Sequence, residues 1–157
     1  MTRRRVVITG LGLVSPVGNT VEQGWRNIVA GRSGIVRVSK FDTSTFPVHI
    51  AGEVRGFDVT AYISSKDARR MDTFIHFGMA AGIQAVRDAG LDKENVADRE
   101  RVGVAIGSGI GGLPLIEVTK DEYNAGGVRK VSPFFVPGSI INMISGNLSI
   151  MYGFKGP

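Results

Sequence analysis

The chain has 157 residues, of which 43% are hydrophobic and 21% charged, so its length and composition suit about one soluble globular domain. No apolar run approaches the roughly 20 residues of a membrane-spanning helix, and the apolar block after the basic N-terminus is too short for a signal peptide, so we expect a cytoplasmic protein. Cysteine is absent, which excludes disulfides, zinc–thiolate sites and a cysteine nucleophile within these residues.

The N-terminal residues are predicted to form one half of a βαβ unit. Residues 5–9 are a short, largely apolar run typical of a buried strand, and glycines punctuate the loop over residues 10–18. Thr20 and Gln23 have the spacing of a capping box, in which side chains satisfy the free N–H groups of a helix start. We expect this helix to end at Gly31 and to bury one apolar face, made of Val21, Trp25, Ile28 and Val29.

The middle of the chain contains a long predicted helix that is rich in small residues. Before it, residues 31–57 are predicted to be irregular, with an edge strand within residues 48–54, and residues 66–70 to form a short basic helix. Asp72 is expected to cap the long helix, which ends at Gly90. Its small interior residues are Gly78, Ala80, Ala81, Gly82 and Ala85. Because each helical glycine costs about 1 kcal/mol, we expect tight packing to compensate and to bury this helix deeply.

A second predicted strand ends in a glycine-rich loop. Residues 102–106 are apolar at nearly every position, and they lead into glycines at 107, 109, 111 and 112. α/β folds place their sites where strands end in such loops. The spacing matches the G-x-G-x-x-G dinucleotide fingerprint, but Pro114 interrupts the motif and residues 126–130 take the place of its second strand. We therefore favour a tight turn and close packing over a nucleotide site.

The C-terminal part is predicted to add two helices. Pro114 can begin a helix that continues to Tyr123, and a last helix is predicted over residues 137–151. Between them, residues 132–137 hold two adjacent phenylalanines between prolines, which cannot both face one ordinary core. In order, the elements predict an α/β fold with a mainly parallel sheet and helices on both faces. Since only two strong strands are present, we expect the chain to be part of a larger fold.

Basic side chains form two clusters. Lys66, Arg69 and Arg70 share the short helix, and Arg129 and Lys130 follow two glycines. A charge run of this kind is usually a solvated face, and nucleic-acid binding would call for interleaved aromatic residues that are missing here. Two compact clusters fit an acidic protein or a phosphate-bearing tether at least as well, in keeping with the net charge of +5.

The two histidines, His49 and His76, give no metal site, because no cluster of histidines and carboxylates has the spacing of metal ligands. His76 lies one helical turn after Asp72, so an Asp–His pair is conceivable, but no serine stands in a nucleophile-elbow context to accompany it. We therefore expect surface or helix-capping histidines.

Several segments resemble the β-ketoacyl-acyl-carrier-protein synthases from one end of the chain to the other. These segments are residues 6–18, 31–35, 41–43, 69–72, 107–112 and 132–137. Ile110 in the glycine loop and the Ser-Pro-Phe-Phe-Val-Pro segment at 132–137 are similar to the synthase II type of this family. The resemblance implies a thiolase-like fold, in which two α/β halves stack, and a homodimer. It also implies that residues 1–157 are the N-terminal part, with the C-terminal half absent.

The reaction implied by the resemblance is the Claisen condensation that elongates fatty acids. An acyl chain moves from acyl-carrier protein to a cysteine, malonyl-acyl-carrier protein loses CO2, and the resulting carbanion attacks the thioester to give 3-oxoacyl-acyl-carrier protein. The family's cysteine lies beyond Pro157 and its two catalytic histidines lie in the second half. No catalytic residue, metal or cofactor is therefore expected in this chain, and the chain alone is expected to be inactive. The alternatives are a non-catalytic, chain-length-factor-like partner subunit and a basic nucleic-acid binder.

The resemblance also implies site residues, position by position. Ile110 matches the residue that gates the acyl pocket, and Phe135 matches one that reaches the pocket of the partner subunit. The basic rim that meets the acidic acyl-carrier protein is matched by Lys66, Arg69, Arg70, Arg129 and Lys130. The expected partners are acyl-carrier protein, acyl and malonyl thioesters and a second subunit, with no nucleic acid and no membrane.

Overall fold

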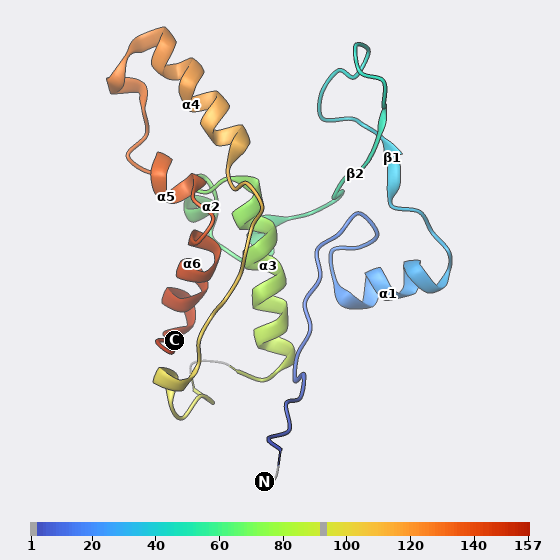
Figure 1. The fold of residues 1–157 in the computed structure, drawn as a ribbon, viewed down its shortest axis with the longest axis vertical. Coiled ribbons are helices and arrows are strands. Elements are labelled where there is room, and N and C mark those ends of the chain that lie inside the picture. The colour runs from blue at the N-terminus through green and yellow to red at the C-terminus, as the bar shows by residue number, and fades with distance from the viewer. Residues whose placement is uncertain (1–2, 92–93) are drawn as a thin grey trace.

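The computed structural model describes residues 3–91 and 94–157. Its α-helices are α1 Val21–Val29, α2 Ser65–Ala68, α3 Thr73–Asp88, α4 Leu113–Gly126, α5 Phe135–Ser139 and α6 Met143–Tyr152. Its strands are β1 Ile35–Arg37 and β2 Ile50–Gly52, and its 3-10 turns are η1 Val59–Ala61, η2 Arg99–Arg101 and η3 Val128–Lys130. Figure 1 shows α3 at the centre, with α6 on one side and the N-terminal segment on the other. None of these helices is long and apolar enough to cross a membrane.

The core lies between α3 and α6, which come from distant parts of the chain (Figure 1). Ile75, Met79 and Ile83 of α3 are at most 1% exposed. An added Cβ at Gly78 would lie 2.6 Å from Ile144 Cδ1 of α6, so glycine lets the two helices approach closely. The predicted long helix, capped by Asp72 and deeply buried, is confirmed.

The two apolar runs predicted as buried strands are not strands in the structure, so this prediction is wrong for the described residues. Residues 5–9 and 102–106 form no ladder, and the sheet in residues 3–91 and 94–157 is the antiparallel pair β1–β2, with Val36 opposite Ala51. A strand needs the N–H and C=O groups of a neighbour, and in Figure 1 the two runs lie on different sides of α3. The expected mainly parallel sheet is therefore not formed within this part of the chain.

The second run still has the period-two burial of a strand. Val104 and Ile106 pack against the core, whereas Ala105 between them is exposed. In the first run, Val6 and Ile8 are 93% and 83% exposed. Described residues thus cover one face of residues 102–106, whereas they cover neither face of residues 5–9.

β1 and β2 pair within the stretch expected to be irregular. β2 lies inside the edge strand predicted over residues 48–54, whereas no prediction corresponds to β1. The carboxylate of Glu53 closes the pair by accepting hydrogen bonds from Ser39 Oγ at 2.6 Å and Ser39 N at 2.9 Å. These two bonds hold the pKa of the Glu53 carboxyl below its ordinary value, and the bond from the Ser39 side chain has the larger effect.

α1 begins as predicted, but its apolar face is exposed. Thr20 Oγ1 accepts a hydrogen bond from Gln23 N at 3.2 Å, which confirms the predicted cap. Trp25 and Val29 are nevertheless 67% and 69% exposed, because no other described element covers that face. An amphipathic pattern indicates which face can be buried, and it carries no information on whether a partner is present.

The single helix predicted over residues 137–151 is two helices, α5 and α6. The chain becomes extended directly after α5, with φ −81° and ψ 144°. The last carbonyls of α5, those of Gly138 and Ser139, accept hydrogen bonds from Asp72 N at 3.0 Å and Gly112 N at 2.9 Å. Because these carbonyls serve other segments, they do not propagate the helix, and α6 starts anew.

Candidate functional site

The glycine loop over residues 107–112 leads directly into α4, and the body of the molecule fixes its end. Gly112 N donates to Ser139 O of α5 at 2.9 Å, and Leu115 N, in the first turn of α4, donates to Asp72 Oδ2 at 2.8 Å. An added Cβ at Gly112 would lie 2.8 Å from Ser139 Cα and 3.1 Å from Asp72 Cβ, so the position requires glycine. The predicted close packing is confirmed at this end of the loop.

The start of the loop is open. An added Cβ at Gly107 or Gly109 would meet no described atom within 4 Å, so close packing among the described residues does not explain these two glycines. The tight turn predicted for the loop is present at Gly111, whose φ is +91°. A positive φ of this kind is adopted readily by glycine alone.

Ile110 and Phe135, the two predicted pocket residues, lie on the two segments that the Gly112–Ser139 bond joins. Ile110 comes two residues before Gly112, and 73% of it is exposed. Phe135 is the first residue of α5 and is half-buried at a cavity of about 170 Å³. The structure thus brings the two backbone segments together and leaves the Ile110 side chain outside the core of the described residues.

The basic end of α2 adjoins the same cavity. Arg69 and Arg70 line it together with Phe134 and Phe135. The Arg70 guanidinium carbon lies 4.1 Å from the centroid of the Phe134 ring, which is the geometry of a cation–π contact. Phe134 and Phe135 thus line one cavity, and Phe134 also lies against a cation. Lys66 is exposed on α2.

The other predicted basic residues, Arg129 and Lys130, lie in η3. This turn stands at the end of α4 that points away from α2 (Figure 1). Both side chains are exposed, and the stem of Lys130 lies against Gly126, where an added Cβ would be 2.6 Å from Lys130 Cγ. The structure thus places the predicted basic rim on two separate elements, the end of α2 and η3.

Both histidines serve the local fold. His49 Nδ1 lies 3.2 Å from Thr43 Oγ1, and His76 Nε2 lies 2.9 Å from Ala68 O. Among residues 3–91 and 94–157, no group of three or more histidine, cysteine, aspartate or glutamate side chains could hold a metal ion. The conceivable side-chain pair of His76 with Asp72 is not formed, because the His76 ring bonds the Ala68 carbonyl instead.

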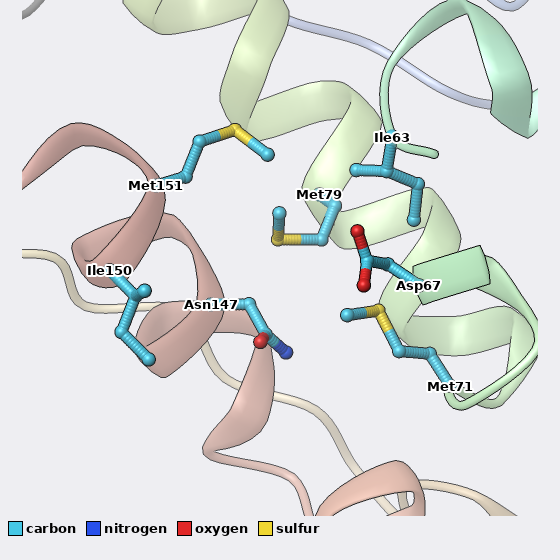
Figure 2. A pocket seen from close by; sticks show the side chains of 7 residues that line it. All are labelled: Ile63, Asp67, Met71, Met79, Asn147, Ile150 and Met151. Carbon is cyan, nitrogen blue, oxygen red and sulfur yellow. The ribbon is translucent and has the colours of Figure 1, made fainter. Parts of the chain in front are cut away.

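A larger cavity of about 350 Å³ was not foreseen in the sequence. It lies between α2, α3 and α6, and Figure 2 shows three methionine side chains around it, with the Asp67 carboxylate at one side. The lining residues are Ile63, Asp67, Met71, Met79, Asn147, Ile150 and Met151. Methionine side chains adapt to the shape of an apolar neighbour, but the Asp67 carboxylate already accepts a hydrogen bond from Ser64 Oγ at 2.6 Å. The cavity therefore combines an apolar, methionine-rich surface with the polar side chains of Asp67 and Asn147, and Asn147 Nδ2 donates to Met143 O at 2.7 Å.

Asp72 is the site residue whose full role sequence reasoning missed. The predicted cap of α3 is confirmed, but its bond to Leu115, 43 residues away, has no local sequence signal. One indirect signal exists. α4 starts at Gly112, Leu113 and Pro114, where no side chain can cap the helix, so another residue has to supply the acceptor.

Residues 3–157 match the family described as Beta-ketoacyl synthase, N-terminal domain. The chain is 59% identical over 159 residues to a 3-oxoacyl-[acyl-carrier-protein] synthase 2 of Vibrio cholerae, with 100% of this chain and 38% of that protein covered. It is 52% identical over 157 residues to the protein of that name from Coxiella burnetii, again over 100% of this chain and 38% of the relative. The chain thus spans 38% of the length of these curated relatives.

Several solved structures match the backbone of this chain. The ishigamide ketosynthase/chain length factor matches with a TM-score of 0.83 at 28% identity, over 99% of this chain and 38% of that chain. A chain from a type II PKS acyl-carrier protein in complex with its ketosynthase matches with a TM-score of 0.78 at 26% identity, over 99% of this chain and 42% of that chain. These neighbours confirm the thiolase-like fold. The chain therefore belongs to the beta-ketoacyl synthase family, as its N-terminal domain.

Proposed function

We propose that the full-length protein is an acyltransferase that elongates fatty acids, a 3-oxoacyl-acyl-carrier-protein synthase of type II. The observation that carries this proposal is the 59% identity to a synthase 2 along the whole chain. Because the chain has no cysteine, the nucleophile has to come from residues outside it. The contribution of these residues is to bind and position substrates.

The proposed reaction forms one carbon–carbon bond. An acyl group is first held as a thioester on a cysteine, with release of the carrier thiol. Loss of CO2 from malonyl-acyl-carrier protein leaves an electron pair on the adjacent carbon, which attacks the thioester carbonyl. The tetrahedral oxyanion requires hydrogen-bond donors, and it collapses with departure of the cysteine thiolate to give 3-oxoacyl-acyl-carrier protein. Within this chain, Ile110 is the proposed gate of the acyl pocket, and Phe135 is proposed to reach the pocket of the partner subunit.

Acyl-carrier protein is the proposed partner, and a homodimer the proposed assembly, in the cytoplasm. One structural neighbour is a ketosynthase in complex with its acyl-carrier protein. The net charge of +5 and the exposed cations Lys66, Arg69, Arg129 and Lys130 suit an acidic partner. The half-buried Arg70, adjacent to Arg69, completes this proposed surface.

The test is a condensation assay with the purified full-length protein. Acyl- and malonyl-acyl-carrier protein should yield 3-oxoacyl-acyl-carrier protein and CO2 in equal amounts. The 157 residues alone should give no product above a no-enzyme control, because they hold no thiol nucleophile. Release of CO2 without 3-oxoacyl product would contradict the proposed condensation.

A chain-length-factor-like subunit is the second candidate, because a ketosynthase/chain length factor shares the backbone with a TM-score of 0.83. Such a subunit would be inactive by itself and would restore product only when mixed with a separate ketosynthase. The same assay, run with and without a second subunit, distinguishes the two candidates.

A further inference from the structure

Asp72 connects three helices through one buried residue. It is 7% exposed and stands at the N-cap of α3, where its Oδ1 accepts a hydrogen bond from Phe74 N at 3.4 Å. Its Oδ2 accepts a shorter bond of 2.8 Å from Leu115 N, in the first turn of α4. Its own backbone N–H donates to Gly138 O of α5 at 3.0 Å.

α4 needs this carboxylate because its own N-cap position carries no side chain. That position is Gly112, which makes no side-chain cap bond. The space for a side chain there is taken by Ser139 and Asp72, whose Cα and Cβ atoms would lie 2.8 Å and 3.1 Å from an added Cβ. The first N–H groups of a helix lack intrahelical partners, and a negative charge is favourable at that end of the helix dipole. Asp72 therefore caps two helices, namely α3, which it directly precedes in the sequence, and α4, which begins in a distant segment.

The same contacts support both predicted pocket residues. Ile110 comes two residues before Gly112, whose N–H is bound to Ser139 O at 2.9 Å, and Phe135 opens the helix that ends at Ser139. Since Ile110 is 73% exposed, no packing in the described core holds its side chain. Its position depends on the backbone that follows it, and Asp72 fixes that backbone.

We propose that Asp72 is a positioning residue of the acyl pocket, whose carboxylate holds the glycine loop, and with it Ile110, in place beside α5. This inference rests on the proposed function, since it concerns the pocket of the same reaction. Asp72 itself touches no reacting atom. Without its carboxylate, the loop moves more easily, Ile110 yields to long acyl chains, and discrimination between short and long chains weakens.

The test compares Asp72→Ala and Asp72→Asn with the parent in the full-length protein. Hydrogen exchange of the peptide over residues 107–116 should be about 5- to 30-fold faster in Asp72→Ala, the effect of losing a cap. The ratio of kcat/KM for long over short acyl chains should rise by about fivefold or more. Asp72→Asn keeps one acceptor oxygen and should fall between the parent and Asp72→Ala in both measurements. If Asp72→Ala fails to fold, Asp72→Asn still tests the proposal in both measurements.

Thr20→Ala is the matched control, because Thr20 caps α1 alone and lies outside these contacts. It should lower stability without changing the ratio of long over short chains. Unchanged exchange in residues 107–116 would overturn the proposal, and so would faster exchange with the length ratio of the parent. If the parent itself makes no condensation product, the proposed function fails, and the exchange arm alone then decides whether Asp72 fixes the loop.

Discussion

Single polar residues in this chain stabilise the fold by bonding backbone groups that lie far away in sequence. Glu53 bonds Ser39 across the β1–β2 pair, and Asp72 bonds Leu115 in another helix. Both carboxylates belong to residues that are 7% exposed, so each bond is made within the fold. Ile110 is the opposite case, because it is largely exposed and can act only through what it meets outside the described core.

The gate role proposed for Ile110 predicts a chain-length effect. In the full-length protein, Ile110→Phe should fill the apolar tunnel, and forcing a long acyl chain past it should cost roughly 1–3 kcal/mol through overpacking. At about 1.4 kcal/mol per factor of ten, kcat/KM for long chains should fall about five- to hundred-fold, while short chains react almost normally. The measurement is kcat/KM across acyl lengths together with the melting temperature. Equal losses at every length with a lower melting temperature would mean that Ile110 is ordinary core.

The hydrogen bonds to Glu53 predict a pH dependence of stability. They lower the pKa of the folded carboxyl from its ordinary value of 4.5, so the charged form stabilises the fold above that pH. This contribution should disappear as the pH falls through the lowered pKa. Glu53→Gln should therefore lose stability near pH 7 and show a flatter profile of unfolding free energy as the pH falls below about 5. Glu22→Gln, on the exposed surface of α1, is the control, and parallel profiles for Glu53→Gln and the parent would contradict the prediction.

Among the elements, α3 and α6 form the best-packed pair, and small residues of α3 receive large residues of α6. An added Cβ at Gly82 would be 3.3 Å from Leu148 Cδ2, and Gly78 faces Ile144 in the same way one turn earlier. Ile144 and Leu148 are 3% and 2% exposed. The cost of glycine in a helix is thus offset by burial that a larger residue would prevent.

Gly78→Ala should destabilise the protein although alanine is the better helix former. The new methyl group would lie 2.6 Å and 2.7 Å from the Cδ1 and Cγ2 atoms of Ile144. Overpacking costs typically 1–3 kcal/mol against a gain of about 1 kcal/mol in helix propensity, so a net loss of up to about 2 kcal/mol is expected. Denaturant unfolding measures it, and adding Ile144→Val should recover part of the loss. Gly146→Ala, whose methyl group would have Met143 Sδ nearest at 3.8 Å, is the control and should be neutral or stabilising.

Over the whole molecule, large apolar side chains are unusually exposed. Val6 and Ile8 in the N-terminal run and Trp25 and Val29 on α1 are between 67% and 93% exposed. Large apolar patches on a surface mark interaction sites or aggregation liabilities, so these exposed residues are candidates for both. The chain nevertheless matches the backbone of a ketosynthase/chain length factor over 99% of its length. The backbone thus follows the course of the family although residues 5–9 and 102–106 form no strands.

The two basic groups predict a loss of affinity for carrier protein when both are reversed. In the full-length protein, Lys66→Glu with Arg129→Glu should raise KM for acyl-carrier-protein substrates roughly 3- to 30-fold if each rim charge contributes about 0.3–1 kcal/mol. The effect should shrink at high salt, because rim charges act mainly on association. Small acyl-thioester mimics should be little affected.

Arg26→Glu with Arg37→Glu changes the net charge equally at two exposed residues outside both clusters and is the control. Equal effects of the two double variants would show that net charge alone matters. If Lys66→Glu with Arg129→Glu weakened carrier-protein and small-thioester substrates equally, the two clusters would have a structural role rather than a role in binding carrier protein.

Sequence reasoning succeeded where the signal is contained in a few neighbouring residues. Thr20 with Gln23 and Asp72 before α3 each mark a helix start, because a cap acts on N–H groups two or three residues away. The small residues of α3 correctly indicated deep burial. The motifs at 107–112 and 132–137 indicated the family, which the match over residues 3–157 confirms. The roles of Ile110, Phe135 and the basic residues stay predictions.

Tertiary structure alone decided which backbone groups meet. Residues 5–9 and 102–106 have the composition of strands, but a ladder requires a series of bonds to a neighbouring strand. Among the described residues, the run 102–106 has a single bond of this kind, from Gly156 N to Val102 O at 2.9 Å, and no ladder forms. The break between α5 and α6 arises because carbonyls at 138 and 139 bond Asp72 and Gly112. The bond from Leu115 to Asp72 spans 43 residues. Local composition thus determined which segments could become helices and where α1 and α3 start, whereas hydrogen-bond partners distant in sequence depend on the folded path of the chain.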